Sequence, residues 1–304
     1  MAKKHASFIP LLKAFFAVVV WGASFIATKI ALHDVSPMTV VWLRFGIGVA
    51  LLGAFVAARK EFAFVSLKEL GYFSLLGFLG ITFHQWLQST GLQTSKATTT
   101  AWIVATIPIF IALLGWFILR ERLGVLGVVG ILLAAFGVLL VVSQGDLGAL
   151  TRGRFGVIGD VLVLISAPNW AVFSVVSRRG LKKHPPTRMM FYVMITGWLF
   201  TSVWFTAGSG YNEVSRLTTD GWIGILFLGV FCSGLAYIYW YDALKEIPAS
   251  KVGSLLYLEP LVAVVVASVF LHEALFLAAF VGGALILAGV WLVNRPNITD
   301  APPD

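Results

Sequence analysis

Runs of apolar residues recur along almost the whole chain, with short polar connections between them. A helix needs about 20 apolar residues to cross a bilayer. Segments of about that length fall at about 11–32, 37–58, 70–90, 98–119, 123–143, 156–177, 189–209, 220–241, 251–271 and 275–294. They lack the alternation that membrane strands require, and lipid leaves a spanning backbone to satisfy its own hydrogen bonds. We therefore predict an all-α integral membrane protein with ten transmembrane helices.

The composition excludes a soluble or a disordered chain. Hydrophobic residues make up 59% of the sequence and charged residues 12%, whereas soluble domains have about 45–50% and about 25%. The net charge of +8 does not predict nucleic-acid binding, because the cations gather in the connections between apolar runs. The lipid bilayer is the expected partner of this surface.

The cations also predict the orientation. Sixteen Lys and Arg residues fall on the side of the chain termini, and four fall on the other side. Cytoplasmic connections are enriched in Lys and Arg, so both termini should be cytoplasmic. We expect a multi-pass protein of the plasma membrane, which is the inner membrane if the source is bacterial.

An internal repeat divides the chain into two halves, residues 1–150 and 151–304. Residues 91–142 align without a gap on residues 243–294 at a shift of 152. Each half would hold five helices. Because five is odd, the second half would be inverted, as in alternating-access transporters with a central cavity. At this shift, Pro108 is equivalent to Pro260, and Glu121 is equivalent to Glu273. At a shift of 149, Trp21 is equivalent to Trp170, and Lys29 is equivalent to Arg178.

Several of these segments resemble a known family. They are WGASFIATK (Trp21–Lys29), WLRF (Trp42–Phe45), the run Pro108, Glu121, Gly130 and Gly137, and its second copy Leu258–Pro260, Glu273, Gly282 and Gly289. The chain resembles the EamA-type members of the drug/metabolite transporter superfamily, and within it the YddG-type exporters of aromatic and neutral amino acids. The resemblance implies a small-molecule transporter of this fold, with an amino acid or a similar metabolite as substrate.

Polar and aromatic residues inside the apolar runs are the expected substrate contacts. A polar side chain in lipid is costly unless it is paired or faces a cavity, so it lines a cavity or bonds a neighbouring helix. Aromatic residues are 14% of the chain, and their faces suit rings and ammonium groups. We predict a substrate site for a small neutral or zwitterionic solute at Trp21, Ser24, His84, Gln88, Thr99, Trp102, Trp170, Tyr237, Ser254 and Tyr257.

Two prolines and a few charges are expected to support movement. Pro108 and Pro260 would kink equivalent helices, either as hinges or as static bends. Glu259 would bind a substrate ammonium or a proton, or hydrogen-bond the backbone freed by the kink. Charges at helix ends would latch opposite membrane faces, through Glu121 with Arg178 and through Glu273 with Lys29 and Arg44.

Other functions remain as alternatives. A broad drug exporter would use the same aromatic wall, whereas a nucleotide-sugar or phosphometabolite exchanger needs deep cations. A membrane enzyme is disfavoured, because we find no nucleophile elbow, metal-ligand cluster or phosphate loop. We expect no catalytic residue, metal site or cofactor. Facilitated diffusion and proton antiport both fit the sequence, and so does a monomer.

Overall fold

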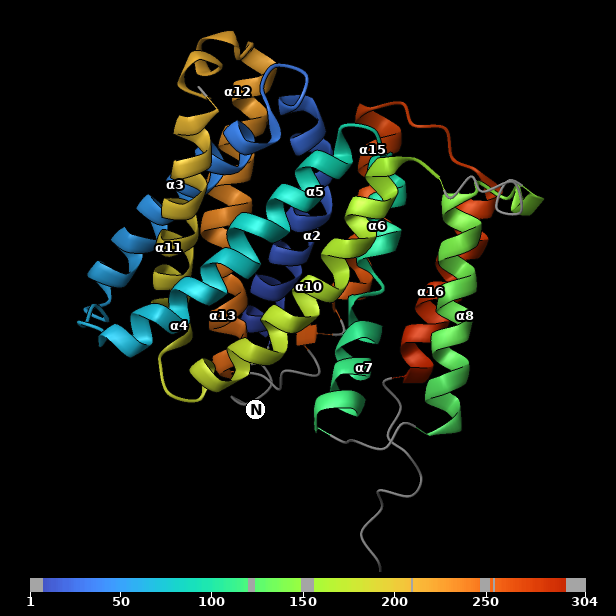
Figure 1. Cartoon of the computed structure of the whole chain (residues 1–304), viewed down its shortest axis with the longest axis horizontal. Helices are drawn as coiled ribbons and strands as arrows, with labels where there is room; N and C mark the ends of the chain where they lie inside the picture. The colour runs from blue at the N-terminus through green and yellow to red at the C-terminus, as the bar shows by residue number, and fades with distance from the viewer. Residues whose placement is uncertain are drawn as a thin grey trace, which may run out of the picture.

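The fold is a bundle of long helices in a computed structural model that describes residues 8–119, 124–148, 156–208, 210–246, 252–253 and 255–293 (Figure 1). Helices are the only regular structure in these ranges. Their bounds are α2 Phe8–Ala31, α3 Pro37–Ala58, α4 Leu67–Gly77, η1 Phe78–Phe83, α5 His84–Leu92, α6 Ala97–Val104, α7 Ile107–Leu119, α8 Val125–Val142, α10 Ile158–Leu181, α11 Pro186–Ala207, η2 Gly210–Asn212, η3 Val214–Arg216, α12 Thr219–Leu226, η4 Phe227–Leu235, α13 Ala236–Glu246, η5 Leu255–Leu258, α15 Glu259–Phe270 and α16 Leu277–Val293.

Seven helical stretches of the described chain are long and apolar enough to cross a membrane. Shorter apolar helices follow at Leu255–Phe270 and Leu277–Val293. The predicted all-helical membrane fold is confirmed at this level, while the number of ten crossings stays a prediction. The seven stretches are Phe8–Ala31, Pro37–Ala58, Ala97–Phe117, Val125–Val142, Ile158–Leu181, Pro186–Ala207 and Thr219–Glu246.

The outer surface of the bundle is apolar. Leu132 of α8 is 65% exposed and Val265 of α15 is 63% exposed. A water-soluble protein rarely exposes contiguous apolar surface on this scale. Lipid tails are the natural solvent for this face, so the helices are multi-pass membrane elements.

Local sequence signals begin several helices. Ser66 accepts a hydrogen bond from the Glu69 backbone amide, and Glu69 accepts one from the Ser66 amide, which makes a capping box for α4. Ser36 precedes Pro37, and proline is favoured in the first turn because it lacks an amide hydrogen that would go unused there. These signals place the helix ends close to the edges of the apolar runs.

A polar junction ties the α2–α3 connection to the start of α12. Asp34 accepts hydrogen bonds from the amide and the hydroxyl of Thr218, at 2.9 and 2.7 Å. Glu213 accepts from the Ser36 amide and the Thr39 hydroxyl, at 2.9 and 2.6 Å. Partial burial raises the pKa of Glu213, but these hydrogen bonds outweigh it and hold the pKa below its usual value. The ionised carboxylate therefore fastens the two connections together.

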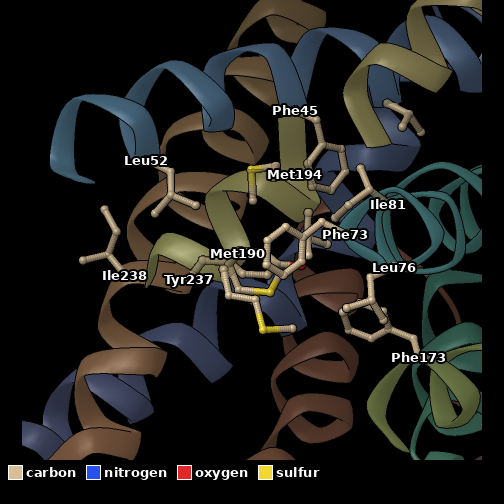
Figure 2. Close-up of a cluster of buried hydrophobic side chains, with 13 residues drawn as sticks. Phe45, Leu52, Phe73, Leu76, Ile81, Phe173, Met190, Met194, Tyr237 and Ile238 are labelled. Atoms are coloured by element: carbon tan, nitrogen blue, oxygen red, sulfur yellow. The ribbon is translucent and has the colours of Figure 1, made fainter. Parts of the chain in front are cut away.

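The largest apolar core joins α3, α4, η1, α10, α11 and α13 (Figure 2). Phe45 of α3 and Met194 of α11 lie near Ile81 and Phe73, and all four side chains are fully buried. Their contacts bring together residues from both halves of the chain. This core fixes the helices that surround the polar residues described below.

The helices α8 and α16 meet along a seam of glycines on one side of the bundle (Figure 1). A β-carbon on Gly137 would lie 2.5 Å from the carbonyl oxygen of Gly282, and one on Gly130 would lie 2.5 Å from that of Gly289. At the repeat shift of 152, Gly130 is equivalent to Gly282 and Gly137 to Gly289. The two helices are therefore antiparallel and use the same face of each repeat.

Candidate functional site

Equivalent helices of the two halves are broken at equivalent residues. The helix α6 ends at Val104 and α7 begins at Ile107, while the 3-10 segment η5 ends at Leu258 and α15 begins at Glu259. Ile107 and Glu259 are equivalent at the shift of 152. The sequence predicted a kink at each proline, and the structure has a helix break at each place. Both prolines are the second residue of a new helix, where no amide donor is lost.

Equivalent π-helical segments lie in the helices that precede these breaks. They are η1 and η4, and both begin with the tripeptide Phe-Leu-Gly, at Phe78 and Phe227. The segment η4 has nine residues and η1 has six. π-Helical insertions are rare and occur frequently at functional sites.

An aromatic group joins the helices α2 and α13. The Trp21 ring lies 5.6 Å from the Tyr237 ring and 5.2 Å from the Trp240 ring, between centroids. Its indole nitrogen donates to the Cys232 carbonyl oxygen of η4 at 3.0 Å. We call Trp21, Tyr237 and Trp240 the first aromatic group. Ser24 is half-buried three residues further along α2.

A second aromatic group joins α10 and α5. The rings of Trp170 and His84 have centroids 4.6 Å apart, and Phe173 lies 4.7 Å from Trp170. The His84 Nδ1 nitrogen donates to the Ser166 carbonyl oxygen at 3.2 Å. Trp170 is the repeat equivalent of Trp21, so each half contributes one tryptophan to an equivalent contact. Gln88 is buried one turn beyond His84.

Arg44 is the single Lys or Arg among the buried side chains of the described residues, at 5% exposure. Its Nε donates to the Ser233 hydroxyl at 3.1 Å, and its Nη1 donates to the Gln85 side-chain oxygen at 3.3 Å. The expected pairing of Arg44 with Glu273 is wrong. The helix α3 places Arg44 beside η4 and α5, so neutral groups are its partners.

Glu273 instead holds the start of α6. Its carboxylate accepts from the Ala97 amide at 2.8 Å and from the Thr98 amide at 3.1 Å. Lys29 lies 3.7 Å from the same carboxylate and donates to the Ser95 carbonyl oxygen at 2.6 Å. The structure thus brings Lys29 and Glu273 together, as the sequence suggested. We call Lys29, Ser95, Thr98 and Glu273 the Glu273 junction.

Three predicted substrate residues lie apart from the two aromatic groups. Trp102 is buried in a core with α8, α15 and α16, and Tyr257 packs against the same core. The Trp102 ring fills the space beside Gly283, and its indole nitrogen has no hydrogen-bond partner among the residues that the structure describes. Thr99 lines a small pocket with Trp102 and Lys96. These residues form a separate region beside α16.

The remaining predicted residues are distributed as follows. Glu259 is half-buried at the first position of α15. Arg178 is exposed near the end of α10. Glu121 and Ser254 lie outside the described residues, so the second latch and that substrate contact stay predictions.

A charge cluster at the other end of α2 from the Glu273 junction was not predicted from the sequence. The Asp242 carboxylate lies 3.0 Å from the Lys13 nitrogen and 2.8 Å from Arg59 Nη1, so it links α13 to α2 and α3. The hydrogen bond with Asp242 raises the pKa of Arg59 above its usual value. Arg59 lies 183 positions before Asp242, and Lys13 lies 229 positions before it. No sequence pattern connects residues so far apart. The one feature of the sequence that points to this cluster is the position of Asp242 just after the apolar run 220–241.

A helical, lipid-facing chain with broken helices at equivalent places in two halves belongs to the class of integral membrane transporters. The model of the EamA-like transporter family matches residues 8–143 and, a second time, residues 157–295. The chain therefore belongs to the EamA-like transporter family.

Relatives agree with this assignment. The uncharacterised transporter YvbV of Bacillus subtilis is 30% identical over 298 residues, covering 93% of this chain and 90% of its own. An uncharacterised transporter of Archaeoglobus fulgidus is 29% identical over 277 residues, covering 91% and 94%. A crystal structure with 21% identity has a TM-score of 0.63 over 94% of this chain and 96% of that chain, which shows a shared fold.

Proposed function

We propose that this protein is an alternating-access exporter of small neutral metabolites in the plasma membrane, with aromatic and other neutral amino acids as its main substrates. The observation that carries the proposal is the pair of aromatic groups next to the paired π-helices, each of which joins rings from both halves of the chain. Indole and phenol rings hold an apolar or aromatic side chain by stacking and by edge contacts. The two repeats would present these groups in turn to opposite sides of the membrane.

The alternatives make different demands on the site. A nucleotide sugar carries two phosphates, which several buried Lys or Arg side chains would have to neutralise. Among the buried residues of the described chain, Arg44 is the single candidate. This favours a substrate with at most one anionic group. A cationic drug would also bind to the aromatic groups. The transport experiment below therefore has to distinguish a cationic drug from an amino acid as the substrate.

Transport by purified protein in liposomes tests the proposal. We expect saturable flux of labelled Phe, Trp and Thr, with Phe and Trp preferred, and no flux of a nucleotide sugar. A cationic dye and an imposed pH gradient complete the comparison. Flux of the dye alone, or no amino-acid flux, would overturn the proposal.

Variants of the aromatic groups sharpen the test. We expect Trp21→Ala and Trp170→Ala each to lower Phe transport about tenfold, because each removes a ring contact of about 1 kcal/mol together with apolar contact area. Trp222→Ala is the matched control, since Trp222 is 38% exposed on the outer surface. Equal rates for the three variants would exclude the aromatic groups as the substrate site.

The Glu273 junction would act as a latch on one membrane face. In Glu273→Gln we expect the face to open more often, because the amides of Ala97 and Thr98 lose an ionised acceptor. A Thr99→Cys reporter should then react at least threefold faster with an impermeant maleimide, against a fully buried Cys232 background. Glu61→Gln is the control. Unchanged labelling, together with parental transport by Glu273→Gln and Glu121→Gln, would refute the latch.

A further inference from the structure

A small pocket lies where the start of α6 meets the end of α8 and the connection from α15 to α16. Its polar lining includes Lys96, Thr99, Trp102 and Gln144, and apolar side chains such as Phe276 complete it. No Asp or Glu of the described ranges lines the pocket. Its cavity volume is about 10 Å³, which is about what one water-sized group needs. The pocket therefore has room for one oxygen atom and carries one positive charge.

Lys96 is a cation without a counter-ion. Its nitrogen lies 4.3 Å from the centroid of the Phe276 ring, which orients it at the pocket. It forms no ion pair with any carboxylate in the part of the chain that the structure describes. Glu273, at the start of the same helix, is already engaged by the Ala97 and Thr98 amides and by Lys29. The charge of Lys96 is therefore available to a ligand.

Trp102 gives a second, independent indication of a ligand. Its side chain is 2% exposed, and its buried indole nitrogen has no hydrogen-bond partner among the described residues. A buried indole N–H usually has an acceptor, and a donor left without one is costly. Because Trp102 lines the pocket, an oxygen atom bound there would supply the missing acceptor.

Exposed apolar side chains border the same pocket. Leu275, Phe276 and Phe280 line it and are 43%, 40% and 46% exposed. Leu275 and Phe276 lie just before α16, and Phe280 lies in its first turn. Lys96 precedes α6 and Gln144 follows α8, so the polar lining belongs to helix ends. A ligand that meets both parts has an anionic head and an apolar chain.

We propose that this pocket binds the phosphate group of an anionic phospholipid, whose acyl chains lie along Phe276 and Phe280. Lys96 pairs with the phosphate, and one phosphate oxygen enters the pocket toward Thr99 and Trp102. A zwitterionic phospholipid binds less tightly, because its ammonium group finds no carboxylate among the described lining residues. Inorganic phosphate lacks the chain contacts. This site does not depend on which solute the protein transports.

Lipid binding to delipidated protein in a neutral detergent tests the proposal. We would measure the thermal midpoint against the concentration of phosphatidylglycerol, phosphatidylcholine or inorganic phosphate. We expect phosphatidylglycerol to reach half of its effect at a concentration about fivefold lower than phosphatidylcholine, which is the contribution of one lysine beside an anionic lipid. We expect no shift with phosphate. Equal concentrations for the two lipids, or the full shift with phosphate alone, would overturn the proposal.

Variants assign the preference to the pocket. Lys96→Gln should abolish the preference for phosphatidylglycerol, and Lys96→Arg should keep it. Arg216→Gln is the matched control, because Arg216 is an exposed cation of η3 that does not line the pocket. Trp102→Phe keeps an aromatic ring but removes the N–H group, so we expect about threefold weaker phosphatidylglycerol binding. Parental lipid binding by Lys96→Gln or by Trp102→Phe, or an equal loss in Arg216→Gln, would contradict the site.

A measurement on the parent protein keeps the test decisive if a variant does not fold. Phosphatidylglycerol with a photoreactive diazirine near the head of one acyl chain would be cross-linked to the protein, and the adducts located by peptide mass spectrometry. We expect adducts within residues 275–280, reduced by an excess of unlabelled phosphatidylglycerol more than by phosphatidylcholine. Adducts confined to other segments would refute the lipid site.

Discussion

Replacement of Gly137 by leucine is expected to prevent the protein from folding. A β-carbon at this position would lie 2.5 Å from the Gly282 carbonyl oxygen and 2.9 Å from Ile286 Cγ1. Because backbone atoms cannot rotate away, the helices α8 and α16 would have to separate. Helix association in lipid depends on close van der Waals packing, so we expect a loss of at least about 3 kcal/mol.

Two further leucine variants complete this experiment. Gly71→Leu is the control, because no atom lies within 4 Å of a β-carbon at exposed Gly71. Gly289→Leu replaces the repeat equivalent and should be as damaging as Gly137→Leu. The measurements are the yield of monodisperse protein in detergent and its thermal midpoint. A Gly137→Leu protein as stable as Gly71→Leu would contradict the seam.

Asp242→Asn is expected to lower stability by about 2 kcal/mol, because the amide has no negative charge and keeps only one of the two acceptor oxygens that Lys13 and Arg59 use. The Asp242 side chain is 8% exposed, and Arg59 contacts both of its oxygens, at 2.8 and 3.0 Å. Lys13 and Arg59 are about a third exposed and can be solvated in the variant. We therefore expect less than the loss of a fully buried ion pair.

The control for this variant is Glu61→Gln. Glu61 lies 3.6 Å from Lys245, whose side chain is 36% exposed, so a change below about 0.5 kcal/mol is expected. Thermal unfolding of both variants in detergent should show a midpoint several degrees lower for Asp242→Asn alone. Equal midpoints would mean that the cluster does not hold α2, α3 and α13 together.

The membrane class and the repeat were predictable because they depend on local and periodic features. Apolar runs identify membrane helices, and paired residues such as Pro108 and Pro260 align the halves whatever their contacts are. The Lys29 and Glu273 contact followed from their common membrane face, since two opposite charges at one level find each other readily.

Other parts of the site could not be predicted from such features. A π-helix is as apolar as the α-helix around it, so the hydropathy of the sequence does not reveal it. The rotation of a helix about its axis decides whether Trp102 faces a cavity or Gly283, and hydropathy does not fix it in helices that are apolar all round. The neutral partners of Arg44 follow from that same rotation.

The seam between α8 and α16 has the character of an interface between two copies of one molecule. In a two-fold symmetric dimer, a patch meets its own copy, and residue i touches j while j touches i. Gly130 touches Gly289, and Gly282 touches Gly137. At the repeat shift of 152 these two contacts are equivalent. Within a single chain, this gives an internal two-fold axis at the seam. A substitution that enlarges one repeat position therefore disturbs a contact equivalent to the one that its counterpart 152 residues away would disturb.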